Sequence, residues 1–229
     1  MAKLLQLYLM FSYFRFKEIS STQKFLMEQS FCQTPLICMA DSQTAGYGQQ
    51  GRTWNSPVGG FYCSLRYFLP YKSSLCGGLT QDLALTIVKT LNPEANFLKL
   101  KWPNDLFFKG EKVGGILVES LPYKDNCLVI IGIGIDLFNL GEVLGLMTND
   151  NLLNLLAPNL FNCLKNWEIQ PYIKDFLSWE KYDLFFNQTV ELQNYGDNFL
   201  ISGIDQKGRL IAKKEEKINF FSNTRIVIR

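Results

Sequence analysis

The chain has 229 residues, of which 47% are hydrophobic and 14% aromatic, so it holds ample material for a packed core. This composition excludes an intrinsically disordered chain. The formal net charge of +2 gives no electrostatic basis for general nucleic-acid binding, so any bound anion must be held by a few local groups. Histidine is absent, which excludes hydrolases that depend on a histidine base or metal ligand.

The N-terminal stretch MAKLLQLYLMFSYFRFKE is too short to span a bilayer, and no small-residue cleavage site follows it. We therefore expect a buried first strand. The six cysteines include no C-x-x-C pair, and several lie in apolar runs, where a free thiol acts as a small hydrophobe. This usage is typical of a reducing compartment and predicts a soluble, cytoplasmic protein without a membrane partner.

Helix and strand patterns follow one another through the first half. Ser20 and Gln23 fit a capping box that opens a short helix. Strands are predicted over PLICMADS and GFYCSLRYFLP, on either side of a glycine-rich loop at 45–57. Apolar residues at helical spacing then predict a helix over 77–92, capped by Thr80.

The next segments predict paired strands. FLKLKW alternates apolar residues with lysine, LFFKGEKVGGILVESL has the pattern of a hairpin turning at Lys109-Gly110, and CLVIIGIGIDL is a further apolar strand. Strands joined by hairpins indicate an antiparallel sheet rather than a doubly wound parallel one. The predicted class is α+β, with a mixed, largely antiparallel sheet and flanking helices.

The C-terminal third divides into helices and short strands. A leucine-rich face predicts a helix from Asn151 that Pro158 kinks or splits, and Pro171 suits the first turn of a second helix through Trp179. After Asn187, four or five short strands predict a small barrel packed on the main domain. The expected domains are residues 1–186 and 187–229.

Three polar, glycine-containing stretches stand out from these apolar elements, and the first is the loop AGYGQQGRTWNSP. Its glycines let backbone amides approach a ligand, Arg52 suits a phosphate or carboxylate, and Trp54 can cover a planar ring. On its own, this loop is slightly better interpreted as a flexible surface connection in which Trp54 anchors to the core.

The second stretch, KWPNDLFFKGEKVGGILVES, places Asn104 and Asp105 at a strand edge and Lys112 just past the hairpin turn. The paired Gly114 and Gly115 indicate either a β-bulge or a bare backbone surface for a ligand whose carboxylate Lys112 neutralises. The alternative is a solvated lysine beside a simple bulge. The third stretch, GIGID, is weak evidence alone and is better interpreted as a close-packed strand crossing.

Taken in order, these stretches resemble the motifs of the biotin protein ligases. GYGQQGRTWNSP, KWPND, KVGGILVE and GIGID are similar to the family's G-R-x-W-x-S-P loop, K-W-P-N-D, K-x-G-G-I-L-x-E and G-I-G-x-N, and GIDQKGRL resembles its C-terminal G-I-D-x-x-G-x-L turn. The resemblance extends from about Ser20 into the last strands. It implies a core like that of class II aminoacyl-tRNA synthetases with an SH3-like C-terminal barrel.

The resemblance implies an ATP-dependent ligase that converts biotin and ATP into biotinyl-5'-AMP and transfers biotin to a lysine of a biotin carboxyl carrier protein. Because two anions react, such a site needs cations and Mg²⁺ rather than a histidine base. The motifs begin close to Met1, so we expect a short form without an N-terminal DNA-binding domain, repressor activity or nucleic-acid partner. Monomer and homodimer both stay open.

The resemblance also carries roles onto matching positions. Lys112 and Arg52 are the expected catalytic residues, and Asp105 is the candidate Mg²⁺ ligand. The expected biotin-binding positions are Ser21, Thr22, Gln43, Gly46, Lys112, Gly114 and Gly115. The expected nucleotide-binding positions are Tyr47, Gln49, Arg52, Thr53, Trp54, Asn104 and Asp136.

Three positions depart from the family pattern. Tyr47 and Gln49 stand where arginines are expected, which predicts weaker retention of biotinyl-AMP. Asp136 replaces an asparagine, so its side chain can accept but not donate a hydrogen bond. Three glycines and few anchors further predict a loop that is mobile without ligand and orders over the adenylate.

Two other functions stay open at this point. A lipoate–protein ligase shares the fold and the adenylation chemistry, although K-W-P-N-D with K-x-G-G-I-L favours biotin. A catalytically silent binding module would explain the missing loop arginines as lost activity.

Overall fold

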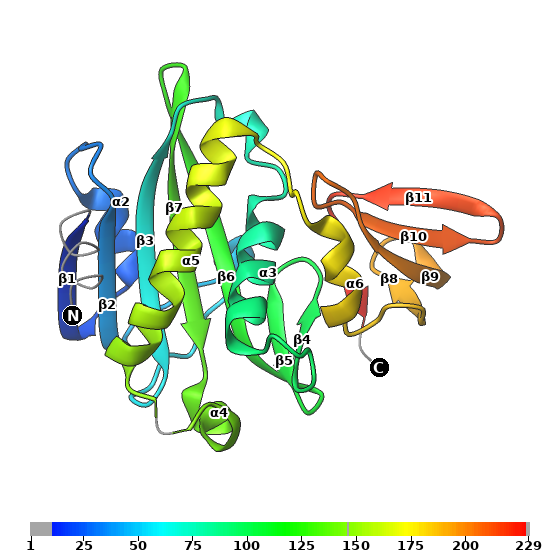
Figure 1. Cartoon of the computed structure of the whole chain (residues 1–229), viewed down its shortest axis with the longest axis horizontal. Helices are drawn as coiled ribbons and strands as arrows, with labels where there is room; N and C mark the ends of the chain where they lie inside the picture. The colour runs from blue at the N-terminus through cyan, green and yellow to red at the C-terminus, as the bar shows by residue number, and fades with distance from the viewer. Residues whose placement is uncertain (1–10, 146, 228–229) are drawn as a thin grey trace.

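In the computed structural model, which describes residues 11–145 and 147–227, the chain forms two β-sheets with helices packed on the larger one (Figure 1). The larger sheet has the strand order β1-β2-β3-β7-β6-β5-β4. Only β1 and β2 pair in parallel, and the other described pairs are antiparallel, which confirms the predicted mixed sheet. Its strands are β1 (Ser12–Ile19), β2 (Leu36–Gln43), β3 (Phe61–Leu69), β4 (Leu98–Lys101), β5 (Asp105–Phe108), β6 (Glu111–Tyr123) and β7 (Asn126–Ile135).

Helices cover both faces of this sheet. Ile37 and Met39 of β2 join the main core, to which α3 (Leu79–Leu91) and α5 (Asn149–Ile169) contribute, and α5 runs across that face in Figure 1. Their neighbours Leu36 and Cys38 pack instead with Leu26 of α2 (Thr22–Glu28). Because successive strand residues point to opposite faces, α2 lies on the other side of the sheet.

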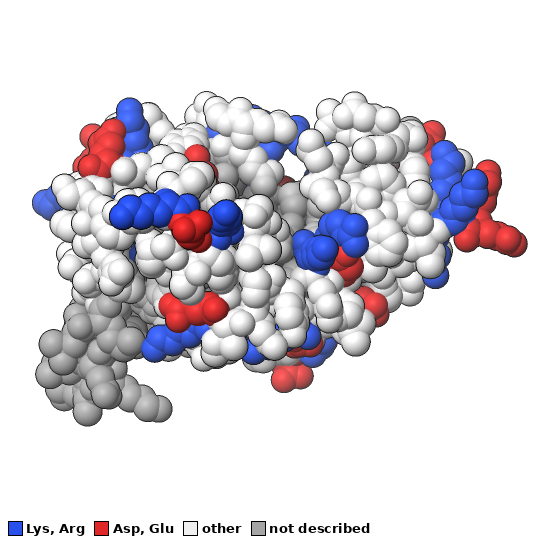
Figure 2. Space-filling model, turned by 90° about the horizontal axis from the view of Figure 1, so that it is seen from above, with Lys and Arg blue, Asp and Glu red and all other residues white. Residues whose placement is uncertain are grey.

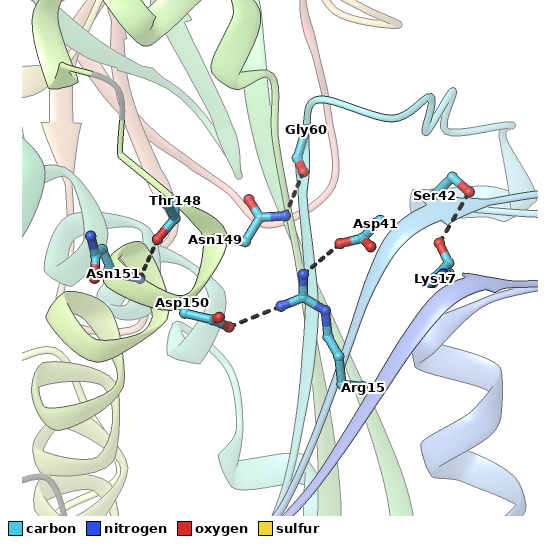
Figure 3. A network of polar contacts seen from close by, with 9 residues as sticks. All are labelled: Arg15, Lys17, Asp41, Ser42, Gly60, Thr148, Asn149, Asp150 and Asn151. Carbon is cyan, nitrogen blue, oxygen red and sulfur yellow. Dashed lines mark hydrogen bonds and ion pairs between the residues drawn. The ribbon is translucent and has the colours of Figure 1, made fainter.

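The first strand differs from the expected buried strand. β1 is an edge strand whose side chains are exposed or half-buried, and residues 1–10 of the predicted strand lie outside the described residues. Arg15 of β1 donates to Asp41 of β2 at 2.5 Å and to Asp150 of α5 at 2.9 Å (Figure 3). Beside them, Asn149 donates to the Gly60 carbonyl at 3.2 Å. The start of α5 is thereby fixed to the edge of the sheet.

Two helix starts also differ from the prediction. Ser21, not Ser20, caps α2, because its Oγ accepts from the Lys24 amide at 3.3 Å. Gly78, with φ of 95°, precedes α3, and Thr80 lies inside the first turn. A Cβ on Gly78 would lie 2.9 Å from the Lys207 carbonyl carbon, so tertiary packing selects glycine here.

The C-terminal helices differ more. α5 is one continuous helix through Pro158, which lies on its exposed side. The predicted second helix from Pro171 is wrong, since the segment is irregular and only η3 (Phe176–Ser178) and α6 (Trp179–Tyr182) follow. The reason is non-local: the Ile173 amide donates to the Gln206 carbonyl at 3.0 Å instead of forming helix.

The C-terminal strands form an antiparallel sheet of order β11-β10-β9-β8-β12. Within the described part of the chain its edge strands do not pair with each other, so the sheet is open where a closed barrel was expected. The domain boundary near Asn187 stays a prediction. The strands are β8 (Thr189–Leu192), β9 (Gly196–Ile204), β10 (Leu210–Lys214), β11 (Lys217–Phe221) and β12 (Ile226–Val227), and the remaining helical segments are η1 (Gln49–Gly51), η2 (Ser73–Leu75) and α4 (Leu137–Leu144).

Surface charge is mixed. On the face shown in Figure 2, Lys and Arg side chains lie interspersed with Asp and Glu, in keeping with the small net charge. Across residues 11–145 and 147–227, no helix combines the length and the apolar character needed to cross a membrane.

Candidate active site

A pocket opens on the α2 side of the larger sheet, and glycines form part of its floor. Gly115 of β6 and Gly132 and Gly134 of β7 line it. A Cβ on Gly132 would lie 2.8 Å from Gln23 Oε1, and one on Gly134 would lie 2.5 Å from Trp54 Nε1. The interpretation of GIGID as a strand crossing is therefore wrong, because its glycines make room for side chains of the pocket.

The loop at 45–57 folds over this pocket as a small hairpin. The Trp54 amide donates to the Gly46 carbonyl at 2.9 Å, and the Gly48 amide donates to the Arg52 carbonyl at 2.8 Å. The Trp54 ring lies against the Lys112 ammonium, 5.0 Å from Nζ to the ring centroid. The loop therefore supplies one wall of the pocket, and Trp54 is part of that wall.

At the α2 end of the pocket, a chain of hydrogen bonds has fixed directions. The Thr22 amide and hydroxyl donate to Gln43 Oε1 at 2.9 and 3.1 Å, so the Gln43 amide nitrogen points away and donates to Ser56 Oγ at 2.9 Å. Since the Thr22 proton is used, Ser64 donates to Thr22 Oγ1 at 2.8 Å. Ser64 is left with lone pairs, whereas Ser21, whose Oγ accepts the helix cap bond, keeps a proton to donate.

β3 also holds the opposite end of α2. Arg66, only 1% exposed, donates to the carbonyls of Leu26, Gln29 and Ser30 at 3.3, 2.9 and 3.0 Å. A cation at a helix C-terminus is favoured by the helix dipole and satisfies carbonyls that lack helical partners. Ser64 and Arg66, two residues apart, thus fix both ends of α2 to the sheet.

At the other end of the pocket, Lys112 Nζ lies 2.6 Å from Asp105 Oδ1. The pairing shifts from Leu106–Gly114 to Phe107–Lys112, which leaves Val113 as the extra residue of a β-bulge. Both interpretations of the paired glycines therefore hold in part, since the bulge exists and Gly115 also lines the pocket.

Positive charge gathers around this pair. Arg52 and Lys112 line the pocket, and Lys101 of β4 lies close to them. Burial lowers the pKa of Lys101, Asp105 raises it, and the charges of Lys112, Arg225 and Arg52 lower it. An anion bound among these cations would relieve their mutual repulsion.

The pocket brings together most of the predicted site residues. Those that line it are Ser21, Thr22, Gln43, Tyr47, Gln49, Arg52, Thr53, Trp54, Asn104, Asp105, Lys112 and Gly115. Asn104 is also a structural residue, because its amide donates to the Ile116 carbonyl at 2.7 Å.

Three predicted residues do not line the pocket. Gly46 and Gly114 are closely packed, with a Cβ on either placed under 3.0 Å from a neighbouring atom. The Asp136 carboxylate caps α4 and accepts from the amides of Phe138 and Asn139 at 3.0 and 3.4 Å. Asp136 lies in a neighbouring hollow that shares Trp54 and Lys112 with the pocket.

Sequence reasoning missed Ser64 and Gln23. Ser64 is a single hydroxyl within an apolar strand, and that isolation is the only signal it gives. Gln23 was assigned to a helix cap, whereas its side chain is 4% exposed and lines the pocket.

Among the residues that line the pocket, Asp105 supplies the one carboxylate that could bind a metal ion. Within the described ranges, no group of three or more Cys, Asp or Glu side chains is placed to hold a metal ion. Mg²⁺ commonly takes one or two carboxylates and completes its shell with phosphate and water oxygens. Asp105 fits that requirement for a Mg²⁺–nucleotide complex.

The chain is similar to known proteins over most of its length. Residues 15–136 match the family described as biotin/lipoate A/B protein ligase. The Escherichia coli bifunctional ligase/repressor BirA is 31% identical over 219 residues, covering 86% of this chain and 68% of that protein. The biotin–[acetyl-CoA-carboxylase] ligase of Paracoccus denitrificans is 37% identical over 105 residues, covering 43% of each.

A solved structure agrees with these matches. The Aquifex aeolicus biotin protein ligase in complex with biotin and ATP has a TM-score of 0.76 at 28% identity, and the alignment covers 95% of this chain and 98% of that one. The matched residues 15–136 contain α2, the loop, the β5–β6 hairpin and the glycines of β7. The chain therefore belongs to the biotin/lipoate A/B protein ligase family.

Proposed function

We propose that this protein is a biotin–protein ligase, which activates biotin with ATP and transfers it to a lysine of a biotin carboxyl carrier domain. Relatives carry this activity in their names, and the Aquifex aeolicus ligase binds biotin and ATP. The observation that carries the proposal is the arrangement of hydrogen-bond donors and acceptors at the α2 end of the pocket.

That arrangement complements a cyclic urea, which presents one carbonyl oxygen between two N–H groups. The Ser21 proton is available for the carbonyl, and lone pairs of Ser64 Oγ and Thr22 Oγ1 are available for N–H donors. The urea ring of biotin therefore finds partners here, while its carboxylate tail reaches toward Lys112.

The same groups disfavour lipoate. Its dithiolane ring neither donates nor accepts strong hydrogen bonds, so it would displace water and leave the Ser21, Thr22 and Ser64 hydroxyls without new partners. Each buried polar group left unpaired costs about 1–3 kcal/mol. The pocket thus separates the two acids by the ring and not by the carboxylate that they share.

The cationic end performs the first chemical step. An oxygen of the biotin carboxylate attacks the α-phosphorus of ATP, a new P–O bond forms, and the bond to the departing pyrophosphate breaks. Lys112 neutralises the approaching anions and is oriented by Asp105, while Arg52 and Lys101 stabilise the polyphosphate. Mg²⁺ bound through Asp105 would supply further charge neutralisation at the phosphate oxygens.

In the second step, a lysine amine of the carrier attacks the acyl carbonyl of biotinyl-AMP, and AMP leaves with the bonding electrons. The amine reaches the anhydride only if the loop at 45–57 admits it, so the loop controls both retention and transfer. All six cysteines are free thiols, in keeping with a reducing, cytoplasmic setting.

Exchange of radiolabelled pyrophosphate into ATP tests this proposal, measured with biotin, with lipoate and with neither acid. Exchange that depends on biotin alone is expected. Exchange with lipoate alone would replace the proposal by a lipoate ligase, and no exchange with either acid would favour a silent binding module. Transfer is then followed by the mass increase of a carrier domain.

Two lysine variants test whether pyrophosphate exchange depends on the pocket that contains Lys112. Lys112→Met removes the ammonium and should lower exchange by a factor on the order of 100 or more, the usual effect of deleting a group that stabilises transition-state charge. Lys213→Met, at the exposed position of β10, is the matched control and should leave exchange unchanged.

A further inference from the structure

The Tyr47 side chain ties the loop at 45–57 to β6 and α2. The Tyr47 hydroxyl donates to Glu119 Oε2 of β6 at 2.9 Å and lies 3.7 Å from Met27 Sδ of α2. Tyr47 stands between Gly46 and Gly48 near the start of the loop, so this bond crosses from the loop to the α2 end of the pocket.

Glu119 is itself held in place by a buried donor. Gln23 Nε2 donates to the same Glu119 Oε2 at 2.9 Å and to the Ile130 carbonyl at 3.0 Å. Because both partners are acceptors, they fix which end of the Gln23 amide faces them. Glu119 therefore offers Tyr47 an acceptor whose position is set by α2 and β7 and not by the loop.

Tyr47 keeps its proton for this bond. Burial raises the pKa of the Tyr47 phenol, and the hydrogen bond to the Glu119 carboxylate raises it further. The contact is thus a neutral donor on a carboxylate. An arginine, which the family pattern expects at this position, would instead make an ion pair.

We propose that Tyr47 is a positioning residue that, through Glu119, holds the loop closed over the α2 end of the pocket. This support is independent of the nucleotide, since Glu119 lies seven residues along β6 from Lys112. The proposal gives Tyr47 a role at the biotin end in place of the nucleotide contact that the motif implies. Its effect on substrates rests on the proposed function, whereas its effect on the loop does not.

Trypsin provides a test that needs no substrate, because Arg52 is an exposed cleavage site inside the loop. Cleavage requires the loop to open, so its rate reports the open population. For ligand-free protein, Tyr47→Phe should accelerate cleavage after Arg52 about tenfold, as loss of a hydrogen bond to a charged group implies. The cut is quantified by mass spectrometry.

Tyr195→Phe is the matched control and should leave the rate unchanged, since Tyr195 is 51% exposed in the turn between β8 and β9. Glu119→Gln should accelerate cleavage like Tyr47→Phe, and the double variant should cleave no faster than either single one. Equal cleavage of wild type and Tyr47→Phe, or fully additive effects, would overturn the proposal. If Glu119→Gln does not fold, Tyr47→Phe decides alone.

A kinetic measurement separates positioning from general destabilisation. In the biotin exchange assay, Tyr47→Phe should raise the KM for biotin and the release rate of biotinyl-AMP about tenfold, with little change in the KM for ATP. An equal rise in both KM values would contradict the assignment. If wild type shows no exchange, the proposed function fails while the proteolysis result still tests the loop contact.

Discussion

Gly134 shows how a missing side chain shapes the site. The Trp54 ring occupies the space that a Cβ at this position would need, with 2.5 Å left to Nε1. A one-carbon addition must therefore displace Trp54 from its place beside Lys112.

We expect Gly134→Ala to fold but to bind ATP about tenfold more weakly, because overpacking costs about 1–3 kcal/mol and is relieved by moving Trp54. Isothermal titration with ATP measures the affinity, and acrylamide quenching reports Trp54 exposure. Gly141→Ala of α4, where an added Cβ meets nothing within 4 Å, is the control. Unchanged quenching in Gly134→Ala would show that Trp54 does not move.

Gln49 lines the pocket without a charge where the family pattern has arginine. We expect Gln49→Arg to slow release of biotinyl-AMP several-fold, since a charge-assisted hydrogen bond to phosphate is stronger than a neutral one. Rapid dilution of the preformed enzyme–adenylate complex measures the release rate. The same rate in wild type and variant would mean that position 49 does not contact the phosphate.

At the scale of single residues, the sequence indicated which residues belong to the site better than it indicated which contacts they make. Lys112, Asp105 and Trp54 were predicted because motif spacing is local, and they do meet in one pocket. The bond from Tyr47 to Glu119 spans 72 residues and leaves no local pattern. The expectation of few loop anchors was wrong for that reason.

Among the elements, α6 ends at a buried carboxyl group, that of Asp183. Asp183, 6% exposed, accepts from Trp179 Nε1 at 3.1 Å and from the Phe185 amide at 2.9 Å. Burial raises the pKa of this carboxyl from 3.8 to about 6. The folded state therefore favours the protonated form, so the stability from this group is fully present below pH 3.8 and is lost as the pH rises through 6.

We expect the unfolding free energy of wild type to fall by about 2 kcal/mol more between pH 4 and pH 7 than that of Asp183→Asn, at about 1.4 kcal/mol per unit of pKa shift. Urea unfolding across this range measures the difference. Asp125→Asn, whose side chain is 91% exposed, should follow wild type. Parallel curves for wild type and Asp183→Asn would contradict the cause given.

Elements with local determinants were predicted well. The β5–β6 hairpin turns at Lys109-Gly110 as expected, with φ of 48° and 83°. Gly110 adopts its positive φ without steric cost, which makes the turn readable from the local sequence. The predicted helix after Pro171 failed because Ile173 pairs with Gln206, 33 positions away. A pattern within one segment cannot contain that partner.

Over the whole molecule, the two sheets are joined by a compact junction. Trp102 Nε1 donates to the Gly208 carbonyl at 2.9 Å, and the backbone of Lys207 packs against Gly78 at the start of α3. The turn of GIDQKGRL is thus wedged against the main sheet and its helices. We infer that the proposed domains 1–186 and 187–229 unfold together.

Calorimetry should accordingly show one transition for wild type. Gly78→Ala adds a Cβ 2.9 Å from Lys207 at a positive φ, and we expect it to lower the Tm by about 2–10 °C, from a cost of about 1–3 kcal/mol. Gly77→Ala, with nothing within 4 Å of the added Cβ, is the control. Two separate transitions in wild type would disprove the coupling.

The hydrogen bonds from Ser64 and Arg66 of β3 to α2 also limit where residues can be inserted in the chain. Side chains alternate along a strand, so inserting one residue ahead of Ser64 would turn both Ser64 and Arg66 to the other face. The guanidinium would then enter the apolar core beneath α3 and α5, and α2 would lose both supports at once. Even a single inserted codon in this strand would therefore remove the proposed biotin end of the pocket.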